Sequence, residues 1–162
     1  MDAPLIINLA DVPAHSHPLR STNLEIEPDG AHWPDTGINV QLLQPGKPNC
    51  LYHREPVQED FLVLHGECIA IVDGEETALK QWDFVHCPAG VDHVFVGAGD
   101  GPCAVLMIGS RRKDEAFYPV NDVAAKYGAS ATQDTGKPRE AYAEWRKLRW
   151  TPIANPWPPA EA

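Results

Sequence analysis

Short apolar runs separated by turn residues fill the middle of the chain, from Val40 to Ser110. They recur at close spacing and are rich in β-branched and aromatic residues, which is typical of the strands of a sandwich or barrel. Eight short strands joined by turns predict an all-β jelly roll, also called a double-stranded β-helix. The eight runs are 40–43, 50–55, 60–64, 68–72, 77–79, 84–87, 93–96 and 103–108.

Turn residues between these runs predict part of the topology. Asp73-Gly74 is the dipeptide that most readily supplies the positive φ angles of a two-residue hairpin turn. The runs on its two sides should therefore be antiparallel neighbours. Pro88 and Gly90 break the chain just before His93, so this histidine should lie at the start of a strand.

The segments outside this region carry a weaker strand pattern. Residues 1–39 are rich in proline and glycine, which predicts an irregular N-terminal arm with one or two edge strands. Residues 111–162 predict a C-terminal extension with one or two helices and a proline-rich, extended tail. We find no internal repeat and expect one domain over residues 1–162, with its barrel at about 40–110.

Two helices are predicted in the C-terminal extension. The first spans 121–127, with Asn121 as its N-cap and Gly128 as its C-terminal stop. The second begins near Pro138 and has an apolar stripe at three-residue steps, so it should pack on the outside of the barrel. The stripe consists of Tyr142, Trp145 and Leu148.

Composition limits the classes of partner. The chain has 162 residues, of which 43% are apolar, enough for one core. It carries 13 basic and 23 acidic residues, so its net charge of −10 opposes binding to nucleic acid or to an anionic bilayer. The longest apolar stretch, 104–108, is far too short to span a membrane.

The N-terminus and the cysteines indicate the compartment. The first residues form no basic leader followed by a long apolar stretch, so we expect a cytoplasmic protein. The four cysteines form no CxxC pair, which argues against a zinc ribbon or a redox dithiol. Each lies in a strand-like run, so we expect buried free thiols.

One segment carries candidate chemistry. His53 and Glu55 are two residues apart in a predicted strand, so their side chains should leave the same face. Glu59 begins the next strand after the short turn 56–58 and could come beside them. The spacing permits a metal site without proving one.

These residues resemble the two motifs of the cupin superfamily. The first motif is Gly, His-x-His, Glu and Gly at set spacings, and the second is Gly, Pro-x-Gly, His and Asn. The positions that correspond to the first are Gly46, His53, Glu55, Glu59 and Gly66, and those that correspond to the second are Trp82, Pro88, Gly90, His93 and Gly97. The chain departs from the motifs at Glu55, Trp82 and Gly97, which stand for a histidine, a glycine and an asparagine.

The resemblance implies a jelly-roll barrel with one divalent metal ion on His53, Glu55, Glu59 and His93. Two carboxylates and two imidazoles form a harder ligand set than three histidines, so Fe, Mn or Zn is expected, with Ni as a further option. Alternatively Glu55 acts as a general base and leaves a set of two histidines and one carboxylate. In a third interpretation the barrel is degenerate, holds no metal, and His93 is structural.

The leading functional hypothesis is a metal-dependent enzyme of the oxygenase or isomerase type that acts on a small organic molecule. The alternative is a non-catalytic cupin that binds or senses a small ligand, with or without metal. The strand region has few positive residues, which favours a neutral or aromatic substrate. A homodimer is implied by the resemblance.

The remaining histidines carry less information. His15 and His17 lie in the arm without a partner carboxylate at barrel spacing, so a surface or loop role is expected. The sequence does not tell whether His65 and His86 face the pocket or the solvent.

Overall fold

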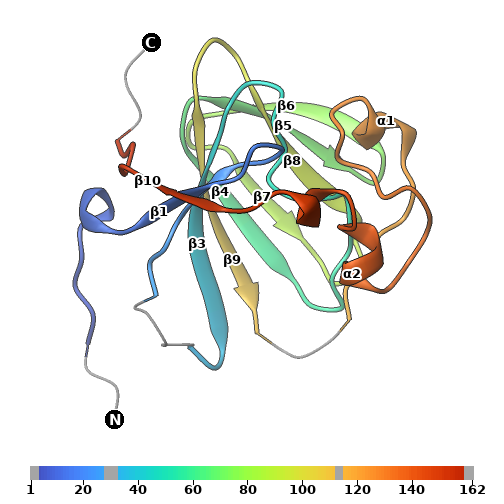
Figure 1. Cartoon of the computed structure of the whole chain (residues 1–162), viewed down its shortest axis with the longest axis horizontal. Helices are drawn as coiled ribbons and strands as arrows, with labels where there is room; N and C mark the ends of the chain where they lie inside the picture. The colour runs from blue at the N-terminus through green and yellow to red at the C-terminus, as the bar shows by residue number, and fades with distance from the viewer. Residues whose placement is uncertain (1–3, 28–32, 112–114, 159–162) are drawn as a thin grey trace.

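The computed structural model, which describes residues 4–27, 33–111 and 115–158, consists of two antiparallel β-sheets that form a double-stranded β-helix (Figure 1). This confirms the all-β jelly roll. In spatial order, the larger sheet contains β10 (Thr151–Ile153), β1 (Ala14–Ser16), β2 (Thr22–Leu24), β3 (Thr36–Leu43), β9 (Cys103–Ser110), β4 (Glu59–His65) and β7 (Phe84–Cys87). The smaller sheet contains β6 (Glu75–Lys80), β5 (Glu67–Val72) and β8 (His93–Ala98).

The core lies between the sheets because alternate residues of each strand point inward. Phe61 and Val63 of β4 face the same interior as Val105 and Met107 of β9, and all four are buried. All four cysteines are free and buried, as predicted.

Two turns show how local sequence sets the backbone. Asp73 and Gly74 have φ values of 47° and 82° and connect β5 to β6, which confirms the predicted hairpin. Trp82, at the motif position of a turn glycine, also has a positive φ, of 76°. A side chain in this region is strained, and Trp82 remains mostly exposed there.

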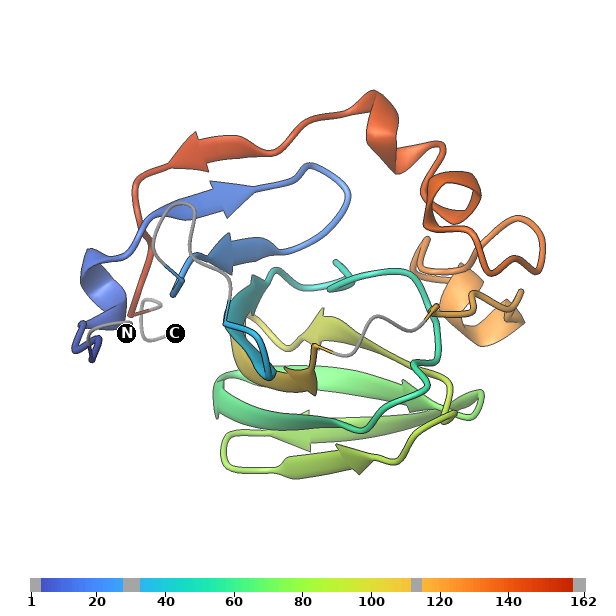
Figure 2. The ribbon, with the colours of Figure 1, turned by 90° about the horizontal axis from the view of Figure 1, so that it is seen from below.

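The arm contributes a hairpin and a short 3-10 turn. The strands β1 and β2 extend the larger sheet beyond β3, and the C-terminal β10 pairs with β1 at the sheet edge. Figure 2 shows this hairpin and β10 as a layer beside the barrel strands. Trp157 packs against the buried cluster beneath them, so the tail holds to the domain as expected. The 3-10 turn is η1 (Leu9–Asp11), capped by Asn8.

The first C-terminal helix follows the prediction, and the second does not. The helix α1 (Asp122–Ala125) begins at Asn121, whose Oδ1 accepts hydrogen bonds from two backbone amides. The second helix is broken into α2 (Pro138–Ala141) and the 3-10 turn η2 (Trp145–Lys147). Tyr142 and Trp145 pack into one apolar cluster, but Leu148 is 42% exposed, so the predicted stripe is incomplete.

None of the helices among the described residues is long and apolar enough to cross a membrane.

Candidate metal centre

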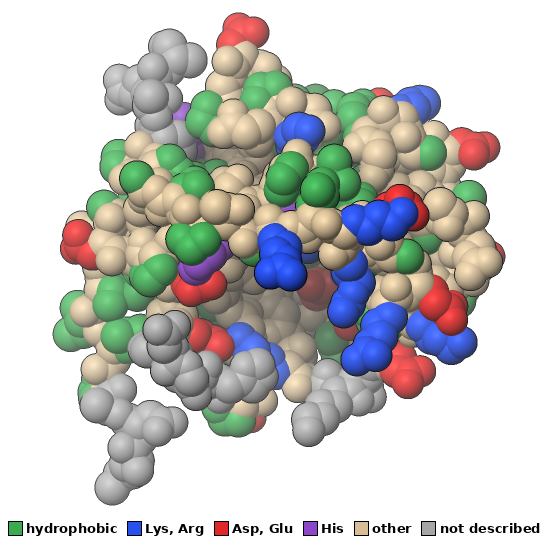
Figure 3. Space-filling model, in the orientation of Figure 1, with side chains coloured by type: hydrophobic (Ala, Val, Ile, Leu, Met, Phe, Trp, Pro, Cys, Tyr) green, Lys and Arg blue, Asp and Glu red, His purple; other side chains and the backbone are tan. Residues whose placement is uncertain are grey.

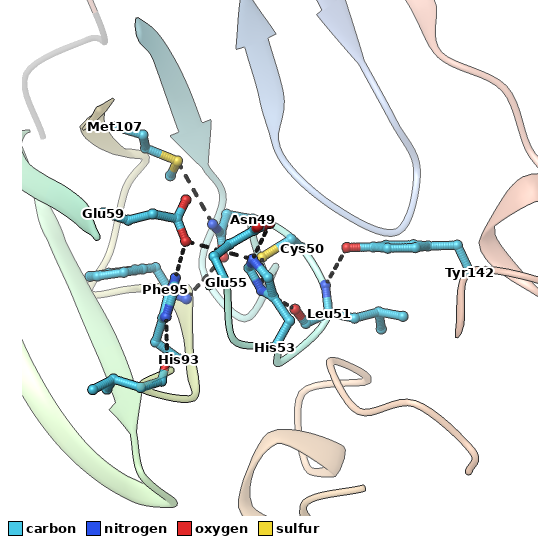
Figure 4. Close-up of polar contacts among 11 residues, drawn as sticks. Asn49, Cys50, Leu51, His53, Glu55, Glu59, His93, Phe95, Met107 and Tyr142 are labelled. Atoms are coloured by element: carbon cyan, nitrogen blue, oxygen red, sulfur yellow. Dashed lines mark hydrogen bonds and ion pairs between the residues drawn. The ribbon is translucent and has the colours of Figure 1, made fainter. Parts of the chain in front are cut away.

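Three of the predicted ligands converge on one point of the barrel. The ligand atoms of His53, Glu59 and His93 all lie within 4.8 Å of one another. Glu59 Oε2 is 3.1 Å from His93 Nε2 and 3.9 Å from His53 Nε2 (Figure 4). Two imidazoles and one carboxylate therefore face a common centre.

His53 reaches this centre from a loop and not from a strand. The run 50–55 forms only isolated bridges, so the prediction that His53 and Glu55 share the face of a regular strand was wrong. The loop is held to β8 instead. Asn49 donates its backbone N–H to Phe95 O and accepts the Phe95 N–H on Oδ1, both at 2.9 Å. Long-range pairing thus positions the ligand.

Each imidazole is oriented by its second nitrogen. Nδ1 of His53 lies 2.9 Å from Leu51 O, and Nδ1 of His93 lies 3.0 Å from Val91 O. A backbone carbonyl only accepts, so Nδ1 carries the proton in each contact. Nε2 of each ring is left facing Glu59. Metal-binding histidines are typically held in this way.

The charges of the cluster are set by burial and by its own members. Burial and repulsion from His93 lower the pKa of His53 to about 4. Burial also opposes charge on His93, but the Cys87 thiol and the Glu59 carboxylate outweigh it and raise its pKa to about 10. Burial disfavours charge on Glu59, yet the two histidines hold its pKa below the usual value. Glu59 is thus an anion beside a cationic His93 when no metal is present.

The donor set fits a divalent cation. Glu59 Oε2 and His93 Nε2 are buried and face each other at 3.1 Å, and neither has a well-aligned hydrogen bond among the described residues. Such atoms are costly to bury unless something satisfies them. A cation at the centre would accept electron pairs from both, and a mixed nitrogen and oxygen set suits Fe, Mn, Ni or Zn.

Glu55 lies beside this group and is not one of its three members. Its Oε1 is 3.8 Å from His53 Nε2, and its side chain is 29% exposed (Figure 4). Its role as a ligand or as a base stays a prediction.

A cavity of about 330 Å³ opens on the three converging residues. Its wall includes polar residues that the sequence patterns did not single out. Asn39 and Gln41 are two residues apart in β3, so their side chains share a face. Their alternation with apolar residues was the sequence feature from which a polar cavity wall could have been predicted. Other lining residues are Asn49, Cys50, Phe61, Met107 and Arg111.

Tyr118 is a further residue at the site without a sequence signal. Its ring stacks on His53, with centroids 5.7 Å apart and an interplanar angle of 21°. It lies in an irregular segment whose packing depends on contacts with Leu51 and Trp145, which are far away in the sequence.

The other histidines do not join the cluster. His86 Nδ1 contacts Asp60 Oδ1 at 2.6 Å, and its side chain is 48% exposed. His15 contacts Glu25 at 3.0 Å, whereas His17 is buried, with Nε2 3.2 Å from Trp145 O. Of the expected surface or loop role, the structure gives His17 the loop position, directly after β1, but buries its side chain. His65, partly buried, ends β4.

The fold and this cluster define a double-stranded β-helix protein with a candidate site of two histidines and one carboxylate. A family model described as cupin domain matches residues 39–109, which include the whole cluster. This part of the chain is thus similar to the cupin family, as the motifs indicated.

Solved structures share this fold. A sugar phosphate isomerase of the cupin superfamily from Silicibacter pomeroyi is 26% identical, with a TM-score of 0.60 over 71% of this chain and 82% of that chain. The polyketide cyclase RemF from Streptomyces resistomycificus is 19% identical, with a TM-score of 0.58 over 68% and 81%. A predicted oxalate decarboxylase from Thermotoga maritima is 17% identical, with a TM-score of 0.56 over 65% and 98%. Among curated proteins, no sequence matches.

Proposed function

We propose that this cupin is a metal-dependent enzyme that acts on a small organic molecule. The observation that carries the proposal is the convergence of His53 Nε2, Glu59 Oε2 and His93 Nε2 on one point of the barrel, within 4.8 Å of one another. We infer one divalent ion, Fe, Mn or Zn, with Ni as a further option. Glu55 serves in the proposal either as a fourth ligand or as a general base.

The residues have separate tasks in this proposal. His53, Glu59 and His93 would hold the ion, which supplies Lewis acidity toward a substrate oxygen or, if it is iron, redox chemistry. The amides of Asn39 and Gln41 line the cavity and can hydrogen-bond polar substrate groups. Phe61 and Met107 form apolar wall that limits water. A carboxylate at Glu55 can accept a proton at the rim.

The reaction class is proposed as isomerase or oxygenase type. The isomerase type has the support of the Silicibacter pomeroyi protein, whose identity to this chain is 26%. The oxygenase type has the support of the donor set, because two histidines and one carboxylate are the ligands of many non-haem iron oxygenases.

The alternative is a cupin that binds or senses a small ligand without turnover. The metal-free form of this alternative has the support of the charge balance, because a cationic His93 already faces an anionic Glu59. In that form the pair is a structural contact inside the barrel.

Elemental analysis of protein purified without chelator tests the proposal. We expect about one divalent ion per chain, as for a single three-residue site. Assays with that protein should then show turnover of hydroxy-carbonyl compounds or consumption of dioxygen. A metal-free protein that retains its fold would favour the structural alternative, and full metal occupancy without turnover would favour the sensing one.

We also propose a cytoplasmic homodimer that binds neither nucleic acid nor membrane. Four free buried thiols support a reducing compartment, and the net charge of −10 supports the exclusion of polyanions. Trp82 and Phe84, 68% and 62% exposed beside the edge strand β7, support a partner surface. Sedimentation analysis tests this: wild type should be dimeric and Phe84→Ser should shift toward monomer, whereas a monomeric wild type contradicts it.

A further inference from the structure

A second cavity, of about 440 Å³, lies outside the metal site, between the β1–β2 turn and the C-terminal segment. Three of its nine lining residues are arginines and none is acidic, in a chain whose net charge is −10. Figure 3 shows Lys and Arg side chains gathered over this part of the face. We call this cavity the arginine groove. Its lining residues are His17, Arg20, Pro138, Tyr142, Trp145, Arg146, Leu148, Arg149 and Trp150.

The guanidinium groups of the groove have no acidic partner among the described residues. Other cations do: Arg54 pairs with Asp92 at 3.2 Å, and Lys147 pairs with Glu144 at 2.6 Å. For Arg20 the Nε atom is also buried without a hydrogen-bond partner in the described part of the chain. A buried donor that lacks an acceptor is costly, so the groove is prepared for an acceptor from outside.

Aromatic rings hold Arg20 in place. Its guanidinium carbon lies 4.9 Å from the ring centroid of Trp150 and 5.8 Å from that of Trp145. Trp145 is buried, and the imidazole of His17 contacts its backbone oxygen at 3.2 Å. Stacking fixes the plane of a guanidinium while leaving edge donors available. A planar fork fixed in this way suits the two oxygens of a carboxylate or phosphate.

The arginine groove leads toward the metal site. Arg20 and Trp150 also line a neighbouring cavity of about 450 Å³ together with Gln41 and with Glu25, which pairs with His15, and Gln41 lines the cavity over the metal ligands. Ser21, the next residue after Arg20, donates its hydroxyl to Gln41 Oε1 at 2.5 Å.

We propose that the arginine groove binds a small organic oxyanion, a carboxylate or a phosphate monoester, with Arg20 as the main anchor and Trp150 against the apolar body of the ligand. Arg146 and Arg149 add positive charge at the rim. Binding of the anion does not require the metal. The further step, that the bound anion is the acidic end of the substrate, rests on the proposed function and on the connection through Gln41. The strand region 40–110 has few cations, and Arg20 of the arm adds one beside Gln41.

Titration calorimetry with phenyl phosphate, benzoate and neutral benzyl alcohol tests the proposal. We expect at least one of the two anions to bind and benzyl alcohol to bind about tenfold more weakly or not at all. The stronger of the two anions identifies the oxyanion type. No binding of either anion, or equal binding of benzyl alcohol, would overturn the proposal.

Charge-matched variants then locate the site. Arg20→Gln should weaken anion binding about tenfold or more, because charge-assisted hydrogen bonds are lost. Arg139→Gln removes the same charge from α2 but does not line the groove, so binding should change by less than about twofold. Equal losses in the two variants would show a general charge effect and refute the assignment.

A second variant and a metal-stripped sample test the groove independently of Arg20→Gln and of the metal. If Arg20→Gln fails to fold, the double variant Arg146→Gln with Arg149→Gln, both on exposed residues, should still weaken binding several-fold, about threefold or more. Its unchanged affinity would then refute the assignment. Anion binding should survive in metal-stripped protein. Protein that is metal-free as purified without chelator and still binds the anion overturns only the proposed function, whereas metal-bound protein that does not bind the anion overturns only this inference.

Discussion

The backbones of His53 and His93 exchange two hydrogen bonds across the barrel. The amide of His53 donates to the carbonyl of His93 at 3.1 Å, and the amide of His93 donates to the carbonyl of His53 at 2.7 Å. Their ring centroids consequently lie 4.8 Å apart. Each ring is also tied through Nδ1 to a carbonyl two residues before it in the chain. The positions of both Nε2 atoms are thus fixed before any cation binds, which is the preorganisation that a metal site requires.

His93→Ala should abolish stable metal binding. The substitution removes one of three ligands and leaves Glu59 without the cation that it faces, so metal affinity should fall about 100-fold or more. Metal-loaded wild type should lose thermal stability in chelator, about 2.7 kcal/mol if the ion was present at 100 times its dissociation constant. The variant should show no such loss. Elemental analysis and thermal unfolding with and without chelator measure both effects.

His86→Ala is the matched control. His86 is 48% exposed and bonded to Asp60 on the outside of the barrel, so the variant should keep its metal. If His93→Ala retained the metal as well as this control does, the ion would have to lie elsewhere.

Much of the fold can be predicted from local sequence patterns. The rest depends on contacts between residues that are far apart in the sequence. The Asp73-Gly74 turn and the Asn121 cap act within a few residues, so the sequence predicts the β5–β6 hairpin and α1. The second predicted helix is broken in the structure, because Tyr142 and Trp145 pack in an apolar cluster whereas Leu148 stays exposed. The sequence pattern of a helix does not show which surface elsewhere in the molecule its apolar side chains will contact.

The same distinction applies to the site. Motif spacing led to His53, Glu59 and His93, which the structure brings together. The local reason given for His53, a regular strand, was wrong because pairing with β8 holds the loop in place. Arg20 approaches the barrel mouth only because the β1–β2 hairpin pairs with β3, and no periodicity in a proline-rich arm reveals that contact.

Glu59→Gln and Glu55→Gln should separate the two carboxylates. Glu59 Oε2 contacts both imidazoles, so its neutral amide should weaken metal binding about tenfold or more. Glu55 Oε1 lies 3.8 Å from His53 Nε2 and is not a member of the converging group, so its amide should weaken binding less. Retained metal with lost turnover in Glu55→Gln would identify a base. Metal loss as large in Glu55→Gln as in Glu59→Gln would instead make Glu55 an equal ligand.

Metal binding should release a proton and strengthen as the pH rises. The pKa of His93 is about 10 in the metal-free cluster, so this group holds a proton that the ion must displace at neutral pH. His53, with a pKa of about 4, is already neutral there, and Glu59 is already charged. One proton per ion corresponds to about tenfold higher affinity per pH unit between about pH 6 and 8. Calorimetry in two buffers of different ionisation enthalpy counts the proton. A release of zero would contradict the charged state assigned to His93.

Gly97→Ala should destabilise the fold and disturb the site together. Gly97 stands where the cupin motif has an asparagine, and a Cβ there would lie 2.3 Å from the backbone oxygen of Gln44. The loop that begins at Gln44 crosses β8 at this point, where Gly46 donates to Gly97 O at 2.8 Å, and it continues to His53. Relief of the clash must move that loop, at a cost of about 1–3 kcal/mol typical of overpacking.

The same shift should weaken metal binding, because His53 moves with the loop. Gly101→Ala is the control: a Cβ at Gly101 meets no atom within 4 Å, so its stability and metal content should match wild type. Chemical denaturation and elemental analysis of the two variants provide the comparison. Equal stability of the Gly97→Ala and Gly101→Ala variants would mean that the loop tolerates a side chain at position 97. Close packing of the loop on β8 would then not explain why glycine replaces the asparagine of the motif.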